Sequence, residues 1–521
     1  MPIEFDPVLV HQWLERSASR NPDKPALIYG QSRRTYGQIL SEVTALARSL
    51  IDLGIERGDR VAIMVGNRPQ AVIAMYGVMK AGAVFVMVSD QLKGQKLAYI
   101  LDNCQAQVLI SHASRAQVVK EAMWLVNSRP QIIWVEAEGG QNPLKKGHRF
   151  EELVRESSIH QATDWPRVID VDLACLIYTS GSTGQPKGIM STHHNMVSAA
   201  RSIIQYIGNE PDDVVLDVLP LSFDYGLYQV IMTFMFGGTV VLERSFVYLH
   251  EVLSRIAQHR VTGWPVVPTI VAMLLRLQDL GRYDLGSLRY MTNTGAALPT
   301  EHIARLRKLL PHVRIYSMFG LIECKRVWYL DPGQLDSRPG SVGKVMPNCE
   351  VFIVDQDGRQ LGPGQVGQLV VRGANVMQGY WADQALTDRT FRPGSYPEDR
   401  RLFTGDLFKM DEDGYLYFVG RQDDMIKCKG ERVSPKEVED TLLQMPGVSE
   451  VAVIGVPDDV LGQAIKAFVI PMPGRQILPQ EVTRFAVDHL EPFMVPKHVE
   501  IVSDLPRTPN GKVDKRQLAI R

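Results

Sequence analysis

Apolar residues recur at helical and strand spacing along the first 110 residues of the chain. Residues 35–55 carry them three and four positions apart, which predicts a helix that ends at Gly54. The run RVAIMV at 60–65 predicts a buried strand, and PQAVIAMYGVMKAGA at 69–83 predicts a second helix before the strand VFVMV. Alternation of this kind indicates a sheet that is covered by helices.

Two changes of pattern divide the rest of the chain. Over 340–420, short strands are separated by glycine turns, which predicts a small antiparallel β subdomain. Near Gly420 the sequence becomes polar and glycine-rich, and a new set of strand and helix patterns follows. We therefore expect an α/β fold. A large N-terminal domain of layered αβ subdomains and the antiparallel subdomain would span 1–419, and a small, mobile α+β C-terminal domain would span 420–521.

Composition narrows the class of protein. Hydrophobic residues make up 45% and charged residues 22% of the chain, which is typical of a soluble globular protein. The net charge of −1 does not favour nucleic acid or a membrane as a partner. The five cysteines are scattered without a C-x-x-C pair, so we expect reduced thiols. We also expect a cytoplasmic location, because the N-terminus does not resemble a signal peptide and no run of about 18 apolar residues occurs.

A loop rich in glycine and hydroxyl side chains lies at 179–188. Its glycines allow successive N–H groups to converge on an anion, and Lys187 adds a positive charge. The segment LACLIY before it predicts a strand, which is the usual position of a ligand loop in an α/β fold. The order differs from the common phosphate loop G-x-x-x-x-G-K-[ST], because Lys187 precedes Gly188. These residues alone fit either a phosphate site or a surface turn.

Four further segments carry candidate polar residues. Glu323 follows an aromatic–glycine turn and could bind Mg²⁺, and Asp406 follows a Thr-Gly turn and could accept from ribose hydroxyls. Arg421 and Asp423 lie in the polar segment GRQDDMIKCKGERV, and Lys512 follows a Pro-Asn-Gly turn. Taken alone, Glu323 and Lys512 are by default surface charges. Asp406 could equally cap a turn, and the segment around Arg421 and Asp423 could be a solvated loop.

Together, in this order and at these separations, the five segments resemble the adenylate-forming superfamily of acyl-CoA synthetases, luciferases and nonribosomal adenylation domains. The resemblance extends from residue 21 to residue 516. It implies that a carboxylic acid and ATP, with Mg²⁺, form an acyl-AMP and pyrophosphate. It further implies that the acyl group then passes to the thiol of CoA or of a phosphopantetheine on a carrier protein.

The resemblance also assigns roles to residues. Lys512 would reach the substrate carboxylate and the α-phosphate, Glu323 would hold Mg²⁺, and Asp423 would be the hinge between the two domains. Rotation at this hinge would bring the face around Lys429 and Gly430 to the thiol. The implied ATP contacts are Thr179, Ser180, Gly181, Ser182, Thr183, Gly184 and Lys187 at the β- and γ-phosphates, Phe319 at adenine, and Asp406 with Arg421 at ribose.

One position departs from the family pattern. The family turn usually reads aromatic–Gly-x-Thr-Glu, whereas this chain has Phe-Gly-Leu-Ile-Glu at 319–323. Ile322 removes a hydroxyl that helps to hold the α-phosphate in the family. We still expect adenylation, because Lys512 and the Mg²⁺ site remain.

The segment LPLSFDYGLYQ at 219–229 bears on which acid is used. An aspartate buried there without a partner would be costly. Asp224 could cap a helix that begins at Tyr225, or it could bind the ammonium group of a substrate. The further pocket residues implied by the resemblance are Tyr225, Tyr228, Trp264, Thr292, Thr294, Gly295 and Met318.

The combination of SFDYGLYQ with GLIECKRV looks like that of stand-alone L-proline adenylating enzymes. We therefore expect adenylation of L-proline and thioester formation on the phosphopantetheine of a separate carrier protein. Acyl ligases of polysaccharide-export gene clusters carry a similar pattern. The alternative is an AMP-forming acyl- or aryl-CoA ligase that uses another carboxylic acid and CoA.

Overall fold

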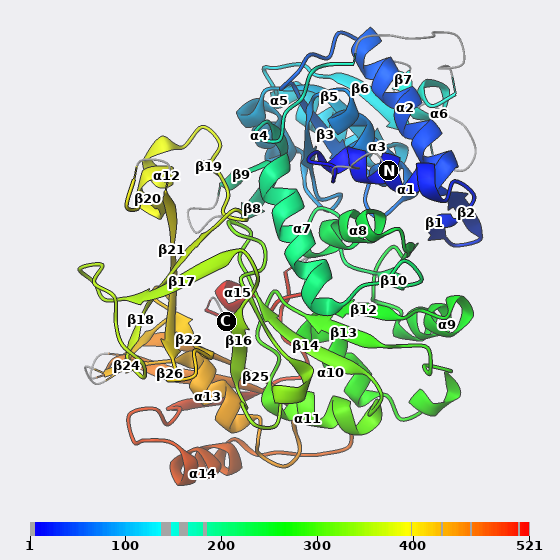
Figure 1. Ribbon diagram of the computed structural model, residues 1–521. Helices are drawn as coiled ribbons and strands as arrows, with labels where there is room; N and C mark the ends of the chain where they lie inside the picture. Colours follow the sequence, from blue (N-terminus) through cyan, green and yellow to red (C-terminus); the bar gives the residue numbers. More distant parts are fainter. Residues whose placement is uncertain are drawn as a thin grey trace. The chain divides into compact units, whose positions relative to one another are not determined.

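The computed structural model describes residues 6–136, 147–155, 165–180, 185–396, 399–428, 431–458, 461–508 and 511–519. The chain divides into two compact units. Unit 1 comprises Met1–Pro265, Leu321–Arg326 and Gly373–Arg400, and unit 2 comprises Val266–Gly320, Val327–Arg372 and Arg401–Arg521 (Figure 1). The predicted α/β fold class is confirmed, and the boundary at 419/420 stays a prediction.

Parallel strands joined by helices form the first sheet of unit 1, as the alternating sequence pattern predicts. Strand β3 pairs in parallel with β4 and β5, and β4 pairs in parallel with β8. The elements of this part are α1 (Val10–Arg20), α2 (Tyr36–Asp52), β3 (Arg60–Met64), α3 (Pro69–Lys80), β4 (Val84–Met87), α4 (Gly94–Cys104), β5 (Ala106–His112), α5 (Ala116–Leu125), β6 (Gln131–Val135), β7 (His148–Arg149), α6 (Phe150–Leu153), β8 (Leu173–Ser180), β9 (Pro186–Thr192), α7 (His193–Ile207) and β19 (Gly379–Tyr380).

A second group of strands in unit 1 carries helix α8 (Asp224–Phe236). Strand β10 pairs in parallel with β11 and β12, β11 pairs in parallel with β1, and β2 is antiparallel to β1. The other elements of this group are β1 (Pro25–Tyr29), β2 (Ser32–Thr35), β10 (Val214–Asp217), β11 (Thr239–Leu242), α9 (Leu249–His259) and β12 (Gly263–Val266). Helix α12 (Gln384–Thr390) contacts β19 instead, and the short strand β20 (Phe391–Pro393) follows it.

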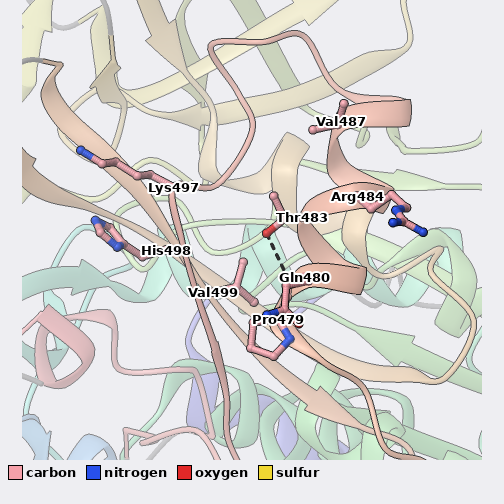
Figure 2. A pocket seen from close by; sticks show the side chains of 8 residues that line it. All are labelled: Pro479, Gln480, Thr483, Arg484, Val487, Lys497, His498 and Val499. Atoms are coloured by element: carbon pink, nitrogen blue, oxygen red, sulfur yellow. Dashed lines mark hydrogen bonds between the residues drawn. The ribbon is translucent and has the colours of Figure 1, made fainter.

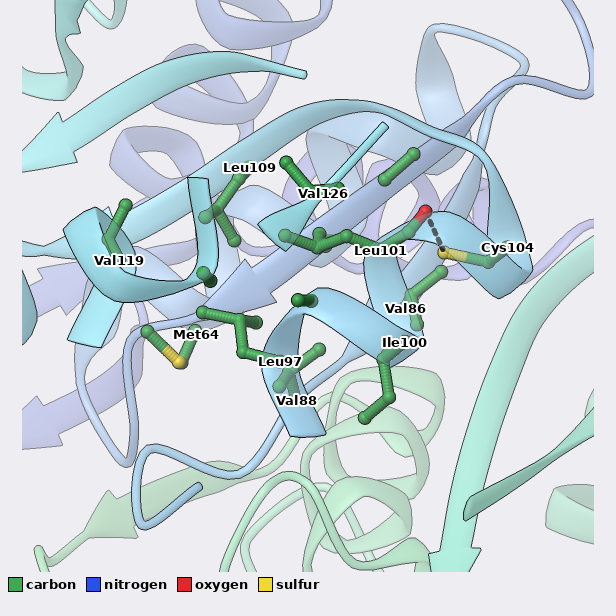
Figure 3. Packing of buried hydrophobic residues seen from close by; sticks show 14 of the residues in the cluster. Met64, Val86, Val88, Leu97, Ile100, Leu101, Cys104, Leu109, Val119 and Val126 are labelled. Carbon is green, nitrogen blue, oxygen red and sulfur yellow. Dashed lines mark hydrogen bonds between the residues drawn. The ribbon is translucent and has the colours of Figure 1, made fainter. Parts of the chain in front are cut away.

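Buried aliphatic side chains fill the space between the first sheet and helices α4 and α5 (Figure 3). Val86 and Leu109 from the strands face Leu97 and Leu101 from α4, and all four are at most 1% exposed. Burial of this apolar surface is the main stabilising contribution to the sheet on which the glycine-rich loop is mounted.

Unit 2 combines a short parallel pair with a larger antiparallel region. Strand β13 is parallel to β14, and β15, β16, β22, β21 and β18 follow in antiparallel pairs, which confirms the antiparallel β subdomain. The elements are α10 (Pro268–Arg276), β13 (Tyr290–Asn293), α11 (Thr300–Leu309), β14 (Arg314–Phe319), β15 (Trp328–Leu330), β16 (Ser341–Val345), β17 (Cys349–Val354), β18 (Val366–Gly373), β21 (Arg400–Met410) and β22 (Leu416–Arg421).

The C-terminal part of unit 2 has a sheet and a core of its own, as its sequence pattern predicts. Ser434 caps α13 by accepting a hydrogen bond from the N–H of Glu437 at 3.3 Å. The elements of this part are β23 (Ile426–Cys428), β24 (Glu431–Val433), α13 (Pro435–Leu442), β25 (Val448–Asp458), β26 (Gly462–Pro471), α14 (Pro479–His489), β27 (His498–Ile501) and α15 (Lys515–Ala519).

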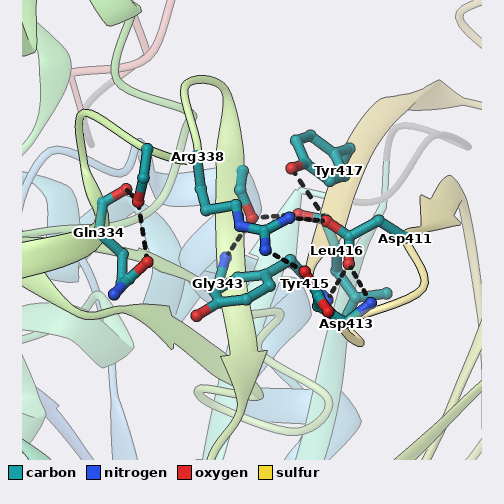
Figure 4. Close-up of polar contacts among 10 residues, drawn as sticks. Gln334, Arg338, Gly343, Asp411, Asp413, Tyr415, Leu416 and Tyr417 are labelled. Carbon is teal, nitrogen blue, oxygen red and sulfur yellow. Dashed lines mark hydrogen bonds and ion pairs between the residues drawn. The ribbon is translucent and has the colours of Figure 1, made fainter.

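In unit 2, an arginine joins the segment before β16 to the turn between the neighbouring strands β21 and β22 (Figure 4). Arg338 Nη1 donates to Asp411 Oδ2 at 2.9 Å, and its other terminal nitrogen pairs with Asp413. The guanidinium also lies 4.5 Å from the ring centroid of Tyr415. We call these residues the Arg338 clamp.

Within the described ranges, no helix combines the length and the apolar character that a membrane crossing requires. The structure describes all five cysteines, and none of them forms a disulfide.

Candidate functional site

The glycine-rich loop joins two strands. Strands β8 and β9 are antiparallel, with Thr179 opposite Lys187 and Ser180 opposite Pro186. Lys187, which is half-buried, therefore lies at the base of the loop. The common phosphate loop instead leads from a strand into a helix. The residues at the tip, 181–184, and the side chain of Ser180 lie outside the described residues.

The segment Leu321–Arg326 is held by hydrogen bonds from the loop that begins at Gly373. The hydroxyl of Tyr380 donates to Glu323 Oε1 at 2.8 Å, and the N–H of Met377 donates to the Glu323 carbonyl at 2.9 Å. Burial, and next the charge of Glu323, raise the pKa of Tyr380, so its phenol keeps the proton that it donates. Glu323 is thereby fixed in backbone and in side chain.

A strained turn follows Glu323. Lys325 has φ 61°, a left-handed conformation that costs a non-glycine residue about 1–3 kcal/mol. The side-chain amide of Asn375 donates to the carbonyls of Cys324 at 2.6 Å and Arg326 at 3.0 Å, on both sides of Lys325. Asn375, only 1% exposed, offsets this strain. It was not predicted, because nothing in the segment ANVMQGY indicates a partner about 50 positions away.

Asp224 forms an ion pair inside unit 1. Its Oδ2 accepts from Arg326 Nη1 at 3.4 Å, and the exposed fractions of the two side chains are 6% and 2%. Helix α8 begins at Asp224 after Phe223 as N-cap, and no side-chain cap is present. The interpretation of Asp224 as the cap of a helix from Tyr225 is therefore wrong.

Two further contacts extend this ion pair into a cationic cluster. The guanidinium of Arg326 lies 4.6 Å from the ring centroid of Tyr225, and Lys325 Nζ lies 5.1 Å from that of Tyr228. Burial lowers the pKa of Lys325, while the charge of Asp224 opposes this effect. Lys325 is fully buried, and its Nζ has no hydrogen-bond partner in the described part of the chain. We call Asp224, Lys325 and Arg326 the buried charge cluster.

The turn before α8 explains why the helix starts where it does. A Cβ on Gly226 would lie 2.6 Å from the carbonyl oxygens of Leu219 and Pro220, so only glycine fits there. The buried side chain of Asn67 donates to the Leu219 carbonyl at 2.8 Å and accepts from the N–H of Leu221 at 2.9 Å. Asn67 and Gly226 position Asp224, and sequence reasoning assigned neither a role.

The predicted adenine and ribose residues lie in unit 2. The ring of Phe319 stacks on Trp328 with a centroid distance of 4.9 Å and an interplanar angle of 8°. Arg421 Nε pairs with Asp406 Oδ1 at 3.1 Å across the β21–β22 ladder. The carboxylate is buried, whereas 58% of the arginine side chain is exposed. Within this unit the structure brings the two predicted ribose contacts together.

The predicted acyl-pocket residues are divided between the units. Tyr225, Tyr228 and Trp264 are buried in unit 1. The others follow or end the parallel strands β13 and β14 in unit 2, where Gly295 has φ 88°. These unit 2 residues are Thr292, Thr294, Gly295 and Met318.

Lys512 follows a tight turn near the C-terminus. The N–H of Thr508 donates to the Lys512 carbonyl at 2.8 Å, and the N–H of Lys512 donates to Thr508 Oγ1 at 3.3 Å. Asp423, the predicted hinge, is exposed in the turn between β22 and β23. Lys429 and Gly430 lie outside the described residues.

The single carboxylate of Glu323 fits a Mg²⁺ ion that is bound together with a nucleotide. In the ranges that the structure describes, no group of three or more His, Cys, Asp or Glu side chains is placed to hold a metal ion. Mg²⁺ is commonly bound through one or two carboxylates, with phosphate oxygens and water as the other ligands. A single ordered carboxylate is therefore sufficient when the metal arrives with a nucleotide.

A separate groove lies on the C-terminal part of unit 2, between α14 and β27 (Figure 2). Its volume is about 660 Å³, and none of the predicted site residues lines it. The lining residues are Pro479, Gln480, Thr483, Arg484, Val487, Lys497, His498 and Val499.

Two segments of the chain match models of known protein families. Residues 14–381 match the AMP-binding enzyme family, and residues 437–512 match the AMP-binding enzyme C-terminal domain. The chain belongs to the AMP-binding enzyme family. The predicted resemblance to adenylate-forming enzymes is thus confirmed, and this AMP-binding enzyme is an AMP-forming acid–thiol ligase.

Relatives of this AMP-binding enzyme include CoA ligases and linear gramicidin synthase subunits. It is 32% identical over 531 residues to a long-chain-fatty-acid–CoA ligase of Bacillus subtilis (strain 168), with 97% of this chain and 93% of that protein covered. It is 30% identical to a linear gramicidin synthase protein of Brevibacillus parabrevis, with 98% of this chain and 6% of that protein covered. The structure of an anthranilate CoA ligase in complex with anthranoyl-AMP matches with a TM-score of 0.89 at 28% identity, covering 99% and 97% of the chains.

Proposed function

We propose that this enzyme is an acyl- or aryl-CoA ligase: it activates a carboxylic acid that lacks an α-ammonium group and transfers the acyl group to CoA. The observation that carries this proposal is the ion pair between Asp224 and Arg326. Asp224 is thus already paired with the guanidinium of Arg326, and both side chains are buried. A substrate ammonium would add a second cation to this one carboxylate in a site of low polarity, which is unfavourable. The near full-length similarity to a fatty-acid–CoA ligase and an anthranilate CoA ligase supports the same choice.

The residues of the site have a common electrostatic task. A carboxylate that attacks the α-phosphate of ATP is an anion approaching an anion, so cationic groups must offset the repulsion. We assign Lys187 to the departing pyrophosphate and Lys512 to the carboxylate and the α-phosphate. Asp406 and Arg421 would hold the ribose, and Phe319 would lie against adenine. Glu323 would hold Mg²⁺, which supplies further positive charge at the phosphates.

Adenylation of L-proline, with loading of a separate carrier protein, is the second candidate function. It is favoured by the similarity to the linear gramicidin synthase protein and by the position of Asp224 at the start of α8. In that case the substrate ammonium would share the Asp224 carboxylate with Arg326.

ATP–pyrophosphate exchange with a panel of acids separates these functions. We expect exchange with a fatty or aromatic acid, formation of the matching CoA thioester by mass spectrometry, and no exchange with L-proline. The Lys512→Ala variant should lose exchange and keep its thermal unfolding temperature. It therefore serves as a folded, inactive control for background exchange. Exchange with L-proline alone, followed by loading of a holo carrier protein and not of CoA, would overturn the first proposal in favour of the second.

A further inference from the structure

Helix α10 of unit 2 contacts the C-terminal segments at both of its ends. At its N-terminal end, the buried hydroxyl of Thr269 donates to the carbonyl of Gly511 and accepts from Arg507 Nη1 at 2.7 Å. Gly511 directly precedes Lys512 and has φ 78°. One hydroxyl thus holds both strands of the turn from which Lys512 projects.

At the C-terminal end of α10, a carboxylate joins two arginines. Glu450 Oε1 accepts from Arg276 Nη2 at 2.7 Å, and Glu450 Oε2 accepts from Arg507 Nη2 at 2.6 Å. Arg276 Nε also donates to the hydroxyl of Ser449 at 3.0 Å. Arg276 is the last residue of α10, and Glu450 lies on β25. The two ends of α10 are therefore connected to the Lys512 turn through Arg507, which contacts both Thr269 and Glu450.

The exposure of these groups suits a contact that forms and breaks. The side chains of Arg276, Glu450 and Arg507 are 32%, 11% and 22% exposed. Charged groups that keep partial access to water can separate at a small free-energy cost, whereas fully buried pairs resist separation. The hydroxyl contact of Thr269 adds direction, since it fixes the carbonyl next to Lys512.

We propose that Thr269, Arg276, Glu450 and Arg507 form a latch that positions Lys512 for acyl-AMP formation and is released for the thiol step. The proposal rests on the two-step ligase reaction proposed above, but it does not depend on which acid or thiol is used. In this view the four residues are positioning residues and Lys512 is the group that meets the substrate. Loss of the latch disfavours the first half-reaction and leaves the second intact or faster.

The test measures the two half-reactions separately in the full-length enzyme. ATP–pyrophosphate exchange reports acyl-AMP formation, and single-turnover thioester formation from a preformed acyl-adenylate reports the thiol step. For Thr269→Val and Glu450→Gln we expect the exchange rate to fall about tenfold. This corresponds to a loss of about 1.4 kcal/mol in the free energy that favours the positioned arrangement of Lys512. The rate of the thiol step should be unchanged or faster. Release of the latch should also speed tryptic cleavage at the exposed Arg421 and Lys427.

Two matched controls distinguish positioning from stability. Thr269→Ser retains the hydroxyl and should keep wild-type exchange. Arg338→Gln removes another arginine of unit 2 that pairs with two carboxylates, and it should change neither half-reaction. Equal losses in both half-reactions, or unchanged exchange in Thr269→Val and Glu450→Gln, would overturn the latch. Wild-type exchange with L-proline alone would overturn the CoA-ligase proposal, whereas the latch is judged on the same variants with L-proline and prolyl-adenylate as substrates.

Discussion

Two arginines of this enzyme pair with aspartates in very different surroundings. In unit 1, the side chains of Arg326 and Asp224 are 2% and 6% exposed. In unit 2, Arg338 and Asp411 of the Arg338 clamp are 29% and 26% exposed, and Asp413 is 59% exposed (Figure 4). The chemistry of the pairs is the same, so the difference in burial decides what each pair does.

The comparison shows that an ion pair with good geometry is not automatically a strong constraint. In the Arg338 clamp, water can replace either partner, so little free energy depends on the contact. In the buried charge cluster, removing one partner leaves a charge without compensation, and the cost is several times larger. The weaker contact by distance, 3.4 Å against 2.9 Å, is therefore the one on which folding depends more.

The largest expected effect comes from Asp224→Asn. It leaves Lys325 and Arg326 buried without an anion, so we expect the free energy of unfolding to fall by about 3–5 kcal/mol. Denaturant titration measures this change. The double variant Asp224→Asn with Arg326→Met should recover part of the loss, because one of the uncompensated cations is then absent. Additive losses in the double variant would contradict the pairing.

An effect of intermediate size is expected from two buried, neutral histidines of unit 1, which make stability depend on pH. Burial, and next the charge of Lys80, lower the pKa of His11 to about 3, and burial, and next His11, lower the pKa of His193 to about 3. The N–H of Val10 donates to His193 Nδ1 at 3.2 Å, which requires an unprotonated nitrogen. Both pKa values lie below the unfolded value of about 6.5, so their contribution to stability is complete above that pH and is lost as pH falls.

We therefore expect the free energy of unfolding to fall by about 2 kcal/mol for each of these histidines when the pH is lowered from about 7.5 to about 5. Urea titrations of the wild type and of His11→Gln at both pH values give the comparison. The decrease between the two pH values should be smaller in His11→Gln by about that amount. An identical decrease in both proteins would show that His11 is not buried in its neutral form.

The smallest expected effect is that of Arg338→Gln. We expect a loss of at most about 1 kcal/mol, and less at high salt, because the clamp is partly exposed. Denaturant titration at low and high salt tests this expectation. A loss as large as that of Asp224→Asn would break the comparison between the two arginines.

Local pattern was sufficient for much of the fold and for the family. The parallel strands β3 and β4 of unit 1 follow from the apolar runs at 60–65 and 84–88. The five segments around Lys187, Glu323, Asp406, Arg421 and Lys512 were sufficient to predict AMP-forming chemistry, because their order along the chain is specific. Their individual roles stay predictions.

The partner of Asp224 could not be predicted in the same way. Arg326 is 102 positions away, and its side chain reaches Asp224 only because the turn at Lys325 takes up a left-handed conformation. That conformation depends on Asn375, a further 49 positions along. An ion pair that requires three distant segments has no signature in any one of them, so the sequence indicated only a helix cap or an ammonium contact for Asp224.

The hydrogen bonds between the Leu321–Arg326 segment and the loop from Gly373 restrict how the sequence of this loop can vary. Asn375, Met377 and Tyr380 hold the carbonyls and the carboxylate of that segment. Glu323 and Lys325 are therefore not independent positions, since both move with the same short stretch of loop. An insertion or deletion there would displace Glu323 and Lys325 in one step. Variation in the loop is thus restricted in length and, at Asn375 and Tyr380, also in side chain.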